Sequence, residues 1–347
     1  MTLAVRYTSA RTLDTAPVEP SPPGPGEVEL APAYVGICGT DLHIFHGDMD
    51  ARVDTPAVLG HEMSGRVVRV GPGMEGWAPG DAVTVMPLRW DDTCPACRAG
   101  HQHICQHLDF IGIDSPGAMQ QRWTVPASTL IRLPESLALD RAALVEPTAV
   151  AVHDVGRAKV TEGEKVVVVG GGPVGVLIAL VARAASAEVR LVELSAHRRL
   201  LAKELGLTVW DPAADDIGAL VGEWTQDAGA DVAFEVSGAA GGVDTAVDVL
   251  GVRGRLCLVA IHPRPREVNL HRFFWRELTL VGARLYGRSD FELAVALVAD
   301  GTIPAERLIS KVVPLTEAPA AFAALEGGGD VMKILVDCID DAQGVAG

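Results

Sequence analysis

One segment near the middle of the chain constrains the fold more than any other. Residues 165–177, KVVVVGGGPVGVL, predict an apolar strand that enters a glycine-rich turn and continues as an apolar helix. The G-x-G-x-x-G spacing in this turn allows close approach of a pyrophosphate to the backbone and close packing of helix on strand. Free N–H groups at the start of such a helix favour phosphate. The predicted dinucleotide-binding residues of the turn are Gly170, Gly172, Pro173, Val174 and Gly175.

The residues around this turn extend the same pattern. From about 148 to 286, strand-like and helix-like stretches alternate, which is typical of a doubly wound parallel sheet. The predicted strands are KVVVVG, AEVRLVE, LTVWD, ADVAFEV, GRLCLVA and LTLVGA, and the predicted helices lie near 174–185, 196–205, 213–226 and 241–250. We therefore predict an α/β fold in which 148–286 form the dinucleotide-binding domain.

The end of the second predicted strand indicates which dinucleotide is bound. Glu193 lies about 20 residues beyond the turn, where a carboxylate can bond both ribose hydroxyls. The same carboxylate would repel a 2′-phosphate, so the sequence favours NAD over NADP. Arg198, in the following helix, is a candidate contact to the adenosine, although an arginine there is equally compatible with a solvated helix face.

The flanking segments predict a second domain. The first 130 residues contain short apolar alternations broken by turn clusters such as PSPPGPGE and GPGMEG, a pattern typical of β-structure. After residue 286 the chain predicts two helices, FELAVALVAD and APAAFAALE, and a final strand, VMKILVD, which we expect to return to the first domain. The predicted domains are therefore 1–147 with 287–347, and 148–286.

Composition excludes several classes of partner. The chain carries 29 basic and 45 acidic residues, a net charge of −16, which repels a nucleic-acid backbone. No apolar run approaches the roughly 18 residues of a membrane span, and the N-terminus lacks a signal peptide, so we expect a cytoplasmic protein without membrane contact. Cys257 and Cys338, in strand-like apolar runs, are predicted to be buried apolar residues and not disulfide partners.

A first group of possible metal ligands is spread along the chain. Cys38 occurs in GICGTDLH, His61 and Glu62 occur in LGHEMSG, and Glu146 occurs in ALVEPTAVAVH. All four are plausible zinc ligands, and an incomplete protein set leaves room for water or an alkoxide. Their spacing alone does not establish a site, because a cysteine near a turn usually packs and a His–Glu pair is usually on the surface.

A second group is compact. Cys94, Cys97 and Cys105 lie within twelve residues, CPACRAGHQHIC, and three such thiolates suit a tetrahedral structural zinc. Asp91 is the predicted fourth ligand, because it precedes Cys94 by the spacing that separates Cys94 from Cys97. The alternatives are a lobe with three free thiols and no metal, or a different fourth ligand among Asp92, His101, His103 and His107.

These motifs together resemble the zinc-containing medium-chain dehydrogenases over essentially the whole chain. GICGTDLH, LGHEMSGRVVRVGPG, LVEPTAVAVH, VVVGGGPVG, ADVAFEVSG and KILVD occur in the family's order. The resemblance implies a GroES-like β-barrel catalytic domain with a structural-zinc lobe at about 88–108, a Rossmann domain that binds NAD, and an active site between the two. The Cys–His–Glu set and the Glu-Pro at 146 point to the polyol and diol branch, and the C-terminal segment looks most like the butanediol dehydrogenases.

The resemblance also implies roles for individual residues. Catalytic zinc would be held by Cys38, His61 and Glu62, with Glu146 on or near the metal. The other implied roles are orientation of His61 by Asp41 and proton relay by Thr40 and His43, for which a surface helix histidine is the alternative. We also expect a homo-oligomer, either a tetramer or a dimer.

Departures from the family pattern reduce the number of substrate classes that we expect. Threonine dehydrogenases carry a histidine where this chain has Met86-Pro87-Leu88-Arg89. Sorbitol dehydrogenases carry an aromatic residue where this chain has Ile44, but the neighbouring Phe45 could replace it. We therefore predict NAD-linked oxidation of a secondary alcohol, a vicinal diol or polyol, to a ketone. A sugar, an aminocyclitol or threonine remain alternative substrates. A zinc-free enone reductase would lack Cys38, His61 and the cysteine lobe, and a non-catalytic NAD-binding protein would lose Thr40 or a zinc ligand.

Overall fold

The computed structural model describes residues 1–262, 264–326 and 330–339, which form two compact units. The first unit contains residues 1–146 together with the described part of 287–347, and the second contains Pro147–Tyr286. Helix α4 (Val145–Arg157) begins in the first unit and continues into the second. Among the described residues, none of the helices has the length and apolar character needed to cross a membrane.

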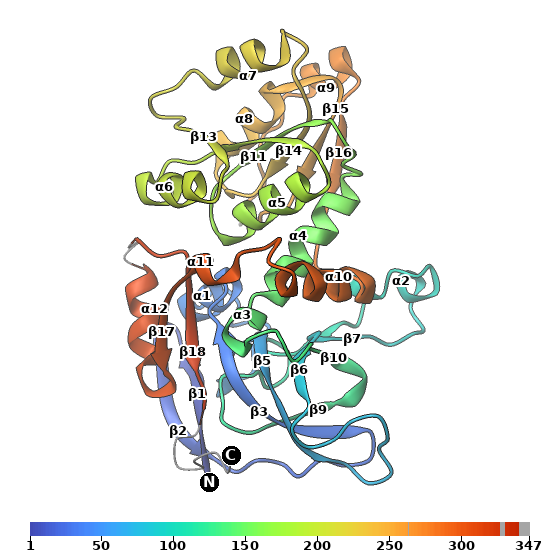
Figure 1. Ribbon diagram of the computed structural model, residues 1–347, viewed down its shortest axis with the longest axis vertical. Coiled ribbons are helices and arrows are strands. Elements are labelled where there is room, and N and C mark those ends of the chain that lie inside the picture. Colours follow the sequence, from blue (N-terminus) through green and yellow to red (C-terminus); the bar gives the residue numbers. More distant parts are fainter. Residues whose placement is uncertain (263, 327–329, 340–347) are drawn as a thin grey trace. The chain divides into compact units, whose positions relative to one another are not determined.

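The second unit is built on a six-stranded sheet in the order β13-β12-β11-β14-β15-β16, and every neighbouring pair is parallel. Helices α5 and α6 lie on one face of this sheet and α7, α8 and α9 on the other (Figure 1). The elements are β11 (Lys165–Val169), β12 (Glu188–Val192), β13 (Thr208–Trp210), β14 (Ala230–Glu235), β15 (Leu250–Leu258), β16 (Thr279–Gly282), α5 (Pro173–Ala184), α6 (Ala196–Glu204), α7 (Ile217–Thr225), α8 (Ala240–Asp248) and α9 (Leu270–Arg276). Strand order reverses between β11 and β14, the place where such sheets bind ligands.

Local sequence explains these elements and two departures from the predicted ones. The valines of β11 are buried because helices cover both faces of a parallel sheet. Helix α7 begins at Ile217 and not near 213, because the Asp216 side chain caps it by accepting a hydrogen bond from the Ala219 N–H. Helix α9 was not predicted, because most of its apolar residues stay exposed and only Phe273 is partly buried, so no periodic buried face marks it. The Asn269 cap at its start was a signal that the sequence did contain.

The first unit is mainly β. A seven-stranded sheet has the order β10-β6-β5-β3-β18-β17 with β9 paired to β3, and a smaller sheet has the order β2-β1-β4. Its strands are β1 (Thr2–Ser9), β2 (Thr12–Val18), β3 (Glu27–Gly36), β4 (Ala57–Val58), β5 (Glu62–Val70), β6 (Ala82–Val85), β9 (Trp123–Pro126), β10 (Leu130–Arg132), β17 (Ile309–Pro314) and β18 (Lys333–Asp337). The last two strands come from the C-terminal segment, and β18 pairs with β3.

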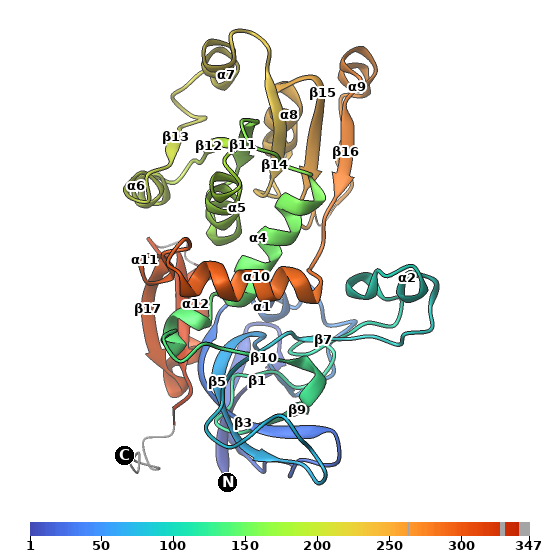
Figure 2. The ribbon, with the colours of Figure 1, turned by 45° about the vertical axis from the view of Figure 1, so that its right-hand side comes forward.

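Helices and a lobe complete the first unit. The helices are α1 (Gly39–His46), α2 (Pro95–Arg98), α3 (Leu139–Ala142), α10 (Arg288–Ala299), α11 (Ala305–Leu308) and α12 (Ala318–Glu326). Helices α1 and α2 interrupt the first 130 residues, which the sequence predicted as β alone. Helix α2 lies with β7 (Leu88–Arg89) and β8 (Asp109–Phe110) in a lobe that projects from the larger sheet (Figure 2). Cys257 and Cys338 are buried free thiols, which confirms that prediction.

Candidate metal centres and dinucleotide site

The glycine-rich turn joins β11 to α5 with no room for side chains at its closest point. A β-carbon placed on Gly175 would lie 1.9 Å from the Gly170 carbonyl oxygen, so the first turn of α5 packs directly on the end of the strand. Gly172 is the N-cap of α5, and no side chain in the described part of the chain caps that end. The first N–H groups of the helix therefore remain available to an anion.

Glu193 is held beside this turn. Its Oε2 accepts a hydrogen bond from the Gly171 N–H at 2.6 Å, and its Oε1 accepts one from the Ser195 N–H at 2.6 Å. The side chain is buried. The guanidinium of Arg198 also reaches the turn, with Nη1 3.8 Å from the position a β-carbon would take on Gly172. The structure thus brings together the turn, the acid and the arginine that the sequence singled out.

A buried carboxylate at the same edge of the sheet was missed by sequence reasoning. Glu235 ends β14, is fully buried, and accepts hydrogen bonds from the Ser237 and Gly238 N–H groups at 2.9 and 3.0 Å. Its other oxygen lies 2.9 Å from Nε2 of His262. A β-carbon on Gly170 would meet the Ser237 nitrogen at 2.8 Å. Glu235 therefore stabilises the loop that contacts the glycine-rich turn. Its position as an acid at the end of a predicted buried strand is the sequence feature that could have identified it.

The first candidate metal centre, which we call the CHE cluster, consists of Cys38, His61 and Glu62. One ligand atom from each lies within 4.8 Å of the other two. Cys38 is the half-buried N-cap residue of α1, His61 immediately precedes β5, and Glu62 begins it. His61 and Glu62 are 2 % and 1 % exposed, a degree of burial at which ionisable side chains require polar partners or a metal.

Asp41 faces His61 from α1. Its Oδ2 accepts a hydrogen bond from the Cys38 N–H at 2.8 Å, while its Oδ1 lies 3.6 Å from Nδ1 of His61, too far for a hydrogen bond. Both of these facing atoms are buried, and neither has a hydrogen-bond partner among the described residues. Burial disfavours the imidazolium, but Asp41 and Cys38 outweigh it and raise the pKa of His61 well above its usual value. Because Nδ1 faces Asp41, Nε2 is the nitrogen left for a metal.

Lys333 is the residue of this centre that sequence reasoning missed. It lies on β18, is 4 % exposed, and its Nζ is 2.8 and 2.6 Å from the two carboxylate oxygens of Glu62. Burial alone would lower the pKa of Lys333, but Glu62 and Cys38 raise it above its usual value. The sequence places this lysine inside the apolar run VMKILVD, where a charged residue requires a buried partner, and that was the available signal.

The other predicted residues of this centre lie at different depths. Glu146, in the first turn of α4, is buried, and its charge raises the pKa values of His61 and Lys333, although it is outside the group of atoms within 4.8 Å. Thr40 is half-buried near the start of α1. His43, on the same helix, is partly exposed and its Nδ1 lies 3.2 Å from Oδ2 of Asp48.

The CHE cluster fits a zinc ion by its chemistry. A thiol, an imidazole and a carboxylate are three of the ligand types that zinc takes in proteins, and three protein ligands leave a position for substrate. Asp41 also lies on the Nδ1 side of the His61 ring, with Oδ1 3.6 Å from Nδ1, which is the side where a carboxylate usually orients a zinc-bound histidine.

The second candidate centre, which we call the lobe cluster, consists of Asp91, Cys94, Cys97 and Cys105. One ligand atom from each of the four lies within 4.8 Å of the others. The Sγ atoms of Cys94 and Cys105 are 3.8 Å apart. A regular tetrahedron with metal–sulfur bonds of about 2.3 Å has edges of about 3.8 Å, so this separation matches a zinc site.

The backbone of the lobe stabilises thiolates. Hydrogen bonds from the Gln106 and Cys97 N–H groups to Sγ lower the pKa of Cys94. Burial and the neighbouring thiols raise the pKa of Cys97 to about 12. The backbone hydrogen bonds thus favour a thiolate at Cys94, and a nearby cation would favour one at Cys97.

Asp91 is fixed in place by its own hydrogen bonds. Its Oδ1 accepts from the Thr93 and Cys94 N–H groups at 2.8 and 2.9 Å, and its Oδ2 lies 2.5 Å from Nδ1 of His107. The hydrogen bond from His107 and those from the backbone hold the pKa of Asp91 far below its usual value. His107 thus contacts Asp91, while Asp92 bonds the Trp90 indole at 2.9 Å and is not part of the described cluster.

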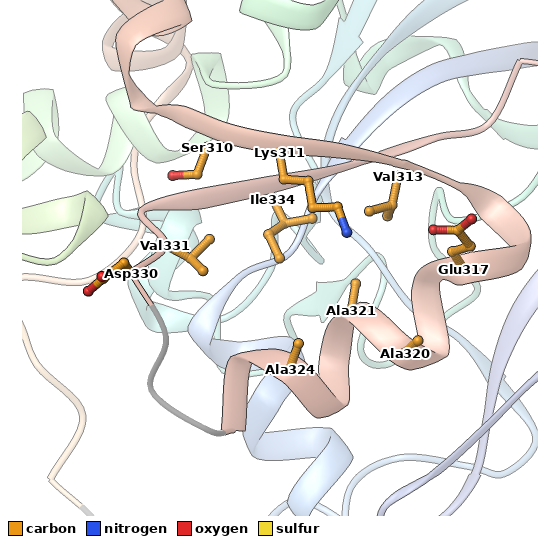
Figure 3. Close-up of a pocket in the computed structure, with 10 residues that line it drawn as sticks. All are labelled: Ser310, Lys311, Val313, Glu317, Ala320, Ala321, Ala324, Asp330, Val331 and Ile334. Carbon is orange, nitrogen blue, oxygen red and sulfur yellow. The ribbon is translucent and has the colours of Figure 1, made fainter. Parts of the chain in front are cut away.

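A cavity of about 310 Å³ also lies in the first unit, between α12 and strands β17 and β18. Figure 3 shows Ala321 and Ala324 of the helix facing Lys311 and Ile334 of the strands. None of the predicted site residues lines it. This cavity is a packing gap beneath an alanine-rich helix, and we assign it no role.

Comparison with known proteins agrees with both units. Residues 24–135 match the model of the alcohol dehydrogenase GroES-like domain, and residues 173–300 match the model of the zinc-binding dehydrogenases. The crystal structure of 2R,3R-butanediol dehydrogenase from Bacillus subtilis superposes with a TM-score of 0.90 at 31 % identity, covering 97 % of this chain and 99 % of that one. The predicted combination of a GroES-like catalytic domain with a Rossmann sheet is thereby confirmed.

Curated relatives are dehydrogenases of polyhydroxylated substrates. A 2-dehydro-3-deoxy-L-galactonate 5-dehydrogenase of Pseudoalteromonas atlantica is 47 % identical over 96 % of this chain and 98 % of its own. The sorbitol dehydrogenase of Halalkalibacterium halodurans is 31 % identical over 93 % of this chain and 95 % of its own. A zinc-binding dehydrogenase of Sinorhizobium meliloti, solved with NADP, gives a TM-score of 0.91 at 32 % identity over 97 % of this chain and 99 % of that one. The chain is therefore an oxidoreductase and belongs to the zinc-dependent medium-chain dehydrogenase family.

Proposed function

We propose that this enzyme oxidises a secondary hydroxyl of a vicinal diol or polyol to a ketone and transfers the hydride to NAD. The observation that carries the proposal is the CHE cluster, a buried thiol–imidazole–carboxylate set in a chain that also has a dinucleotide turn. Among polyols, a sugar acid is the class to test first, because the relative that shares 47 % of its residues with this chain acts on one.

The residues of the CHE cluster would hold catalytic zinc through Cys38 Sγ, Nε2 of His61 and a Glu62 oxygen. When bound, zinc would supply Lewis-acid chemistry that lowers the pKa of the alcohol. Asp41 would keep the ring of His61 in position. Glu146, buried nearby, supplies a further carboxylate on or near the metal.

The proton of the alcohol would leave through side chains of α1. Thr40 is half-buried on this helix, and its hydroxyl can accept one proton while it donates another. His43 is partly exposed and hydrogen-bonded to Asp48, so it can pass the proton to solvent. The hydride would pass to the nicotinamide, and that chemistry belongs to the cofactor. We propose NAD and not NADP because the Glu193 carboxylate is fixed at the turn.

A substrate screen tests this proposal. Vicinal diols, polyols, sugars, sugar acids, aminocyclitols and threonine would each be supplied with NAD, and NADH formation followed by absorbance. We expect substrates with a secondary hydroxyl beside another hydroxyl to have the highest kcat/KM, with sugar acids foremost, and we expect threonine to be poor. If threonine or a simple primary alcohol were the best substrate, the proposed substrate class would be wrong.

We further propose that the lobe cluster holds a structural zinc with Asp91 as its fourth ligand. Replacing Asp91 by alanine should lower the zinc content of the purified protein and reduce its melting temperature by roughly several degrees, because metal binding contributes to folding stability. Metal analysis and thermal unfolding measure the two effects. Asp92→Asn, which removes the charge of an exposed neighbouring carboxylate outside the cluster and tolerates its left-handed backbone (φ 55°), is the matched control. Full zinc content in Asp91→Ala would show that another group is the fourth ligand.

We also propose that the protein is a cytoplasmic homo-oligomer, a tetramer or a dimer. Strand β16 is an edge of the six-stranded sheet, and Leu280 on it is 48 % exposed. Leu270, Phe274 and Trp275 on the adjacent α9 are 74, 75 and 68 % exposed. An unpaired edge strand beside exposed apolar side chains is the kind of surface that a second copy covers.

The proposed cytoplasmic location is supported by the cysteines. All six are free thiols, which agrees with a reducing compartment.

A further inference from the structure

We infer that Lys333 is a positioning residue that competes with the metal for Glu62 and thereby sets how tightly the CHE cluster holds its ion. This inference rests on the proposed metal site at that cluster. It concerns Lys333, to which no catalytic role is assigned above.

The contacts of Lys333 use the full capacity of its ammonium group. Nζ lies 2.8 Å from Oε1 and 2.6 Å from Oε2 of Glu62, and 3.2 Å from the Ile37 carbonyl oxygen. An ammonium has three protons and no acceptor, so three oxygen partners satisfy it. Lys333 and Glu62 are 4 % and 1 % exposed, so water does not compensate either charge.

The sheet is built to allow this pair to form. Glu62 lies on β5 and Lys333 on β18, and β3 runs between these two strands. The two side chains meet over Gly36 of β3, which is paired with Glu62 on one side and with Leu335 on the other. A β-carbon on Gly36 would lie 2.1 Å from Glu62 Oε2. A glycine at this position is therefore needed for the carboxylate to reach across the strand to the lysine.

The positive charge of Lys333 affects the stability of the metal-free protein and that of the metal-bound protein differently. Without metal, it is the cation that contacts the Glu62 carboxylate, and a buried carboxylate without such a partner is strongly destabilising. With metal, the ion would take an oxygen of Glu62, and the ammonium would repel the dication at short range. Lys333 therefore stabilises the metal-free protein more than the metal-bound one, and it weakens metal binding.

This competition has a consequence for the coordination of the ion. Because both Glu62 oxygens are bonded to Lys333, the carboxylate would bind the metal weakly and exchangeably, while Cys38 and His61 remain the firm ligands. An exchangeable carboxylate can leave a position free for a substrate oxygen. Lys333 thus acts through Glu62 and not on the substrate.

The experiment uses the full chain and Co²⁺ as the probe. Metal-free wild type, Lys333→Met, Lys333→Arg and Lys311→Met would be titrated with Co²⁺, and binding followed by its visible absorption. Cys38→Ser lacks the thiol of the CHE cluster, so its absorption comes from Co²⁺ at the lobe cluster. That absorption is subtracted from each of the other titrations. We expect Lys333→Met to bind Co²⁺ at the CHE cluster about tenfold more tightly, because a nearby positive charge and a competing partner are both removed. We expect Co²⁺ affinity close to that of wild type in two controls. Lys333→Arg keeps the buried positive charge, and Lys311→Met removes an exposed lysine on β17.

Thermal unfolding separates this role from simple structural support. Lys333→Met should lower the melting temperature of the metal-free protein much more than that of the Co²⁺-loaded protein, because ligand linkage then adds stability. Unchanged or weaker Co²⁺ binding in Lys333→Met, or an equal loss of stability in both forms, would overturn the inference. If metal-free Lys333→Met does not fold, Lys333→Gln purified with metal should release it to a chelator more slowly than wild type; equal or faster release would also overturn it. Wild type without a Cys38-dependent Co²⁺ signal would instead refute the metal site itself.

Discussion

Replacing Cys38 by serine is expected to lower kcat/KM by at least about a thousandfold, or about 4 kcal/mol of transition-state stabilisation. Cys38 supplies the thiol of the CHE cluster, and a serine hydroxyl is a much poorer zinc ligand than a thiolate. The residue is a half-buried helix N-cap, so the substitution removes little packing. Steady-state formation of NADH with the best substrate of the screen measures the effect.

Two controls make the Cys38 result interpretable. NAD binding by Cys38→Ser, measured by titration, should remain close to wild type, because the glycine-rich turn belongs to the separate compact unit Pro147–Tyr286. Cys257→Ser removes a buried thiol in that second unit and serves as the matched cysteine variant. Turnover that persists in Cys38→Ser, in protein shown by metal analysis to lack zinc at this cluster, would refute the proposed mechanism.

Replacing Glu193 by serine is expected to shift the ratio of kcat/KM for NAD to that for NADP by on the order of a hundredfold. Two effects act in the same direction: NAD loses hydrogen bonds from the ribose hydroxyls to a carboxylate, and the 2′-phosphate of NADP loses a repulsive neighbour. We expect the wild type to prefer NAD by at least about tenfold. Steady-state kinetics with both cofactors at a fixed substrate concentration provide the measurement.

The choice of control matters here because Glu193 also bonds the backbone of the turn. Glu193→Gln keeps the shape and removes the charge, so it should shift the cofactor ratio with less loss of turnover. Glu188→Ser changes an exposed acid at the opposite end of β12 and should leave the ratio unchanged. A wild-type enzyme that prefers NADP would show that the carboxylate does not select the cofactor.

The second unit was the more predictable part of the fold. Its strands carry runs such as KVVVV, and α6 begins directly after Ser195, whose cap is visible in the sequence. The exceptions have physical causes. Helix α9 leaves Phe274 and Trp275 exposed, so it lacks the periodic buried face on which sequence prediction depends. In the first unit, α1 and α2 are short and follow turn signals that resemble those of β-hairpins.

The candidate sites were predictable where the ligands are close in sequence or belong to a motif. The lobe cluster follows from spacing, including Asp91, because a single local segment supplies all four donors. Lys333 could not be placed, because its partner Glu62 is 271 residues away and only the order of strands in the sheet brings them together. Glu235 was missed for a similar reason, since His262 reaches it from the loop after a different strand.

The position of β18 in the larger sheet has a consequence for how the protein is made. The ribosome synthesises β3 and β5 before the second unit, whereas β18, which pairs with β3, emerges only after the whole of that unit. During translation the second unit, a continuous segment, can fold while one edge of β3 still lacks its neighbour. The Glu62 carboxylate likewise has no lysine partner until Lys333, 271 residues later, has been synthesised. A nascent chain can therefore fold its second unit before the CHE cluster has all of its neighbours.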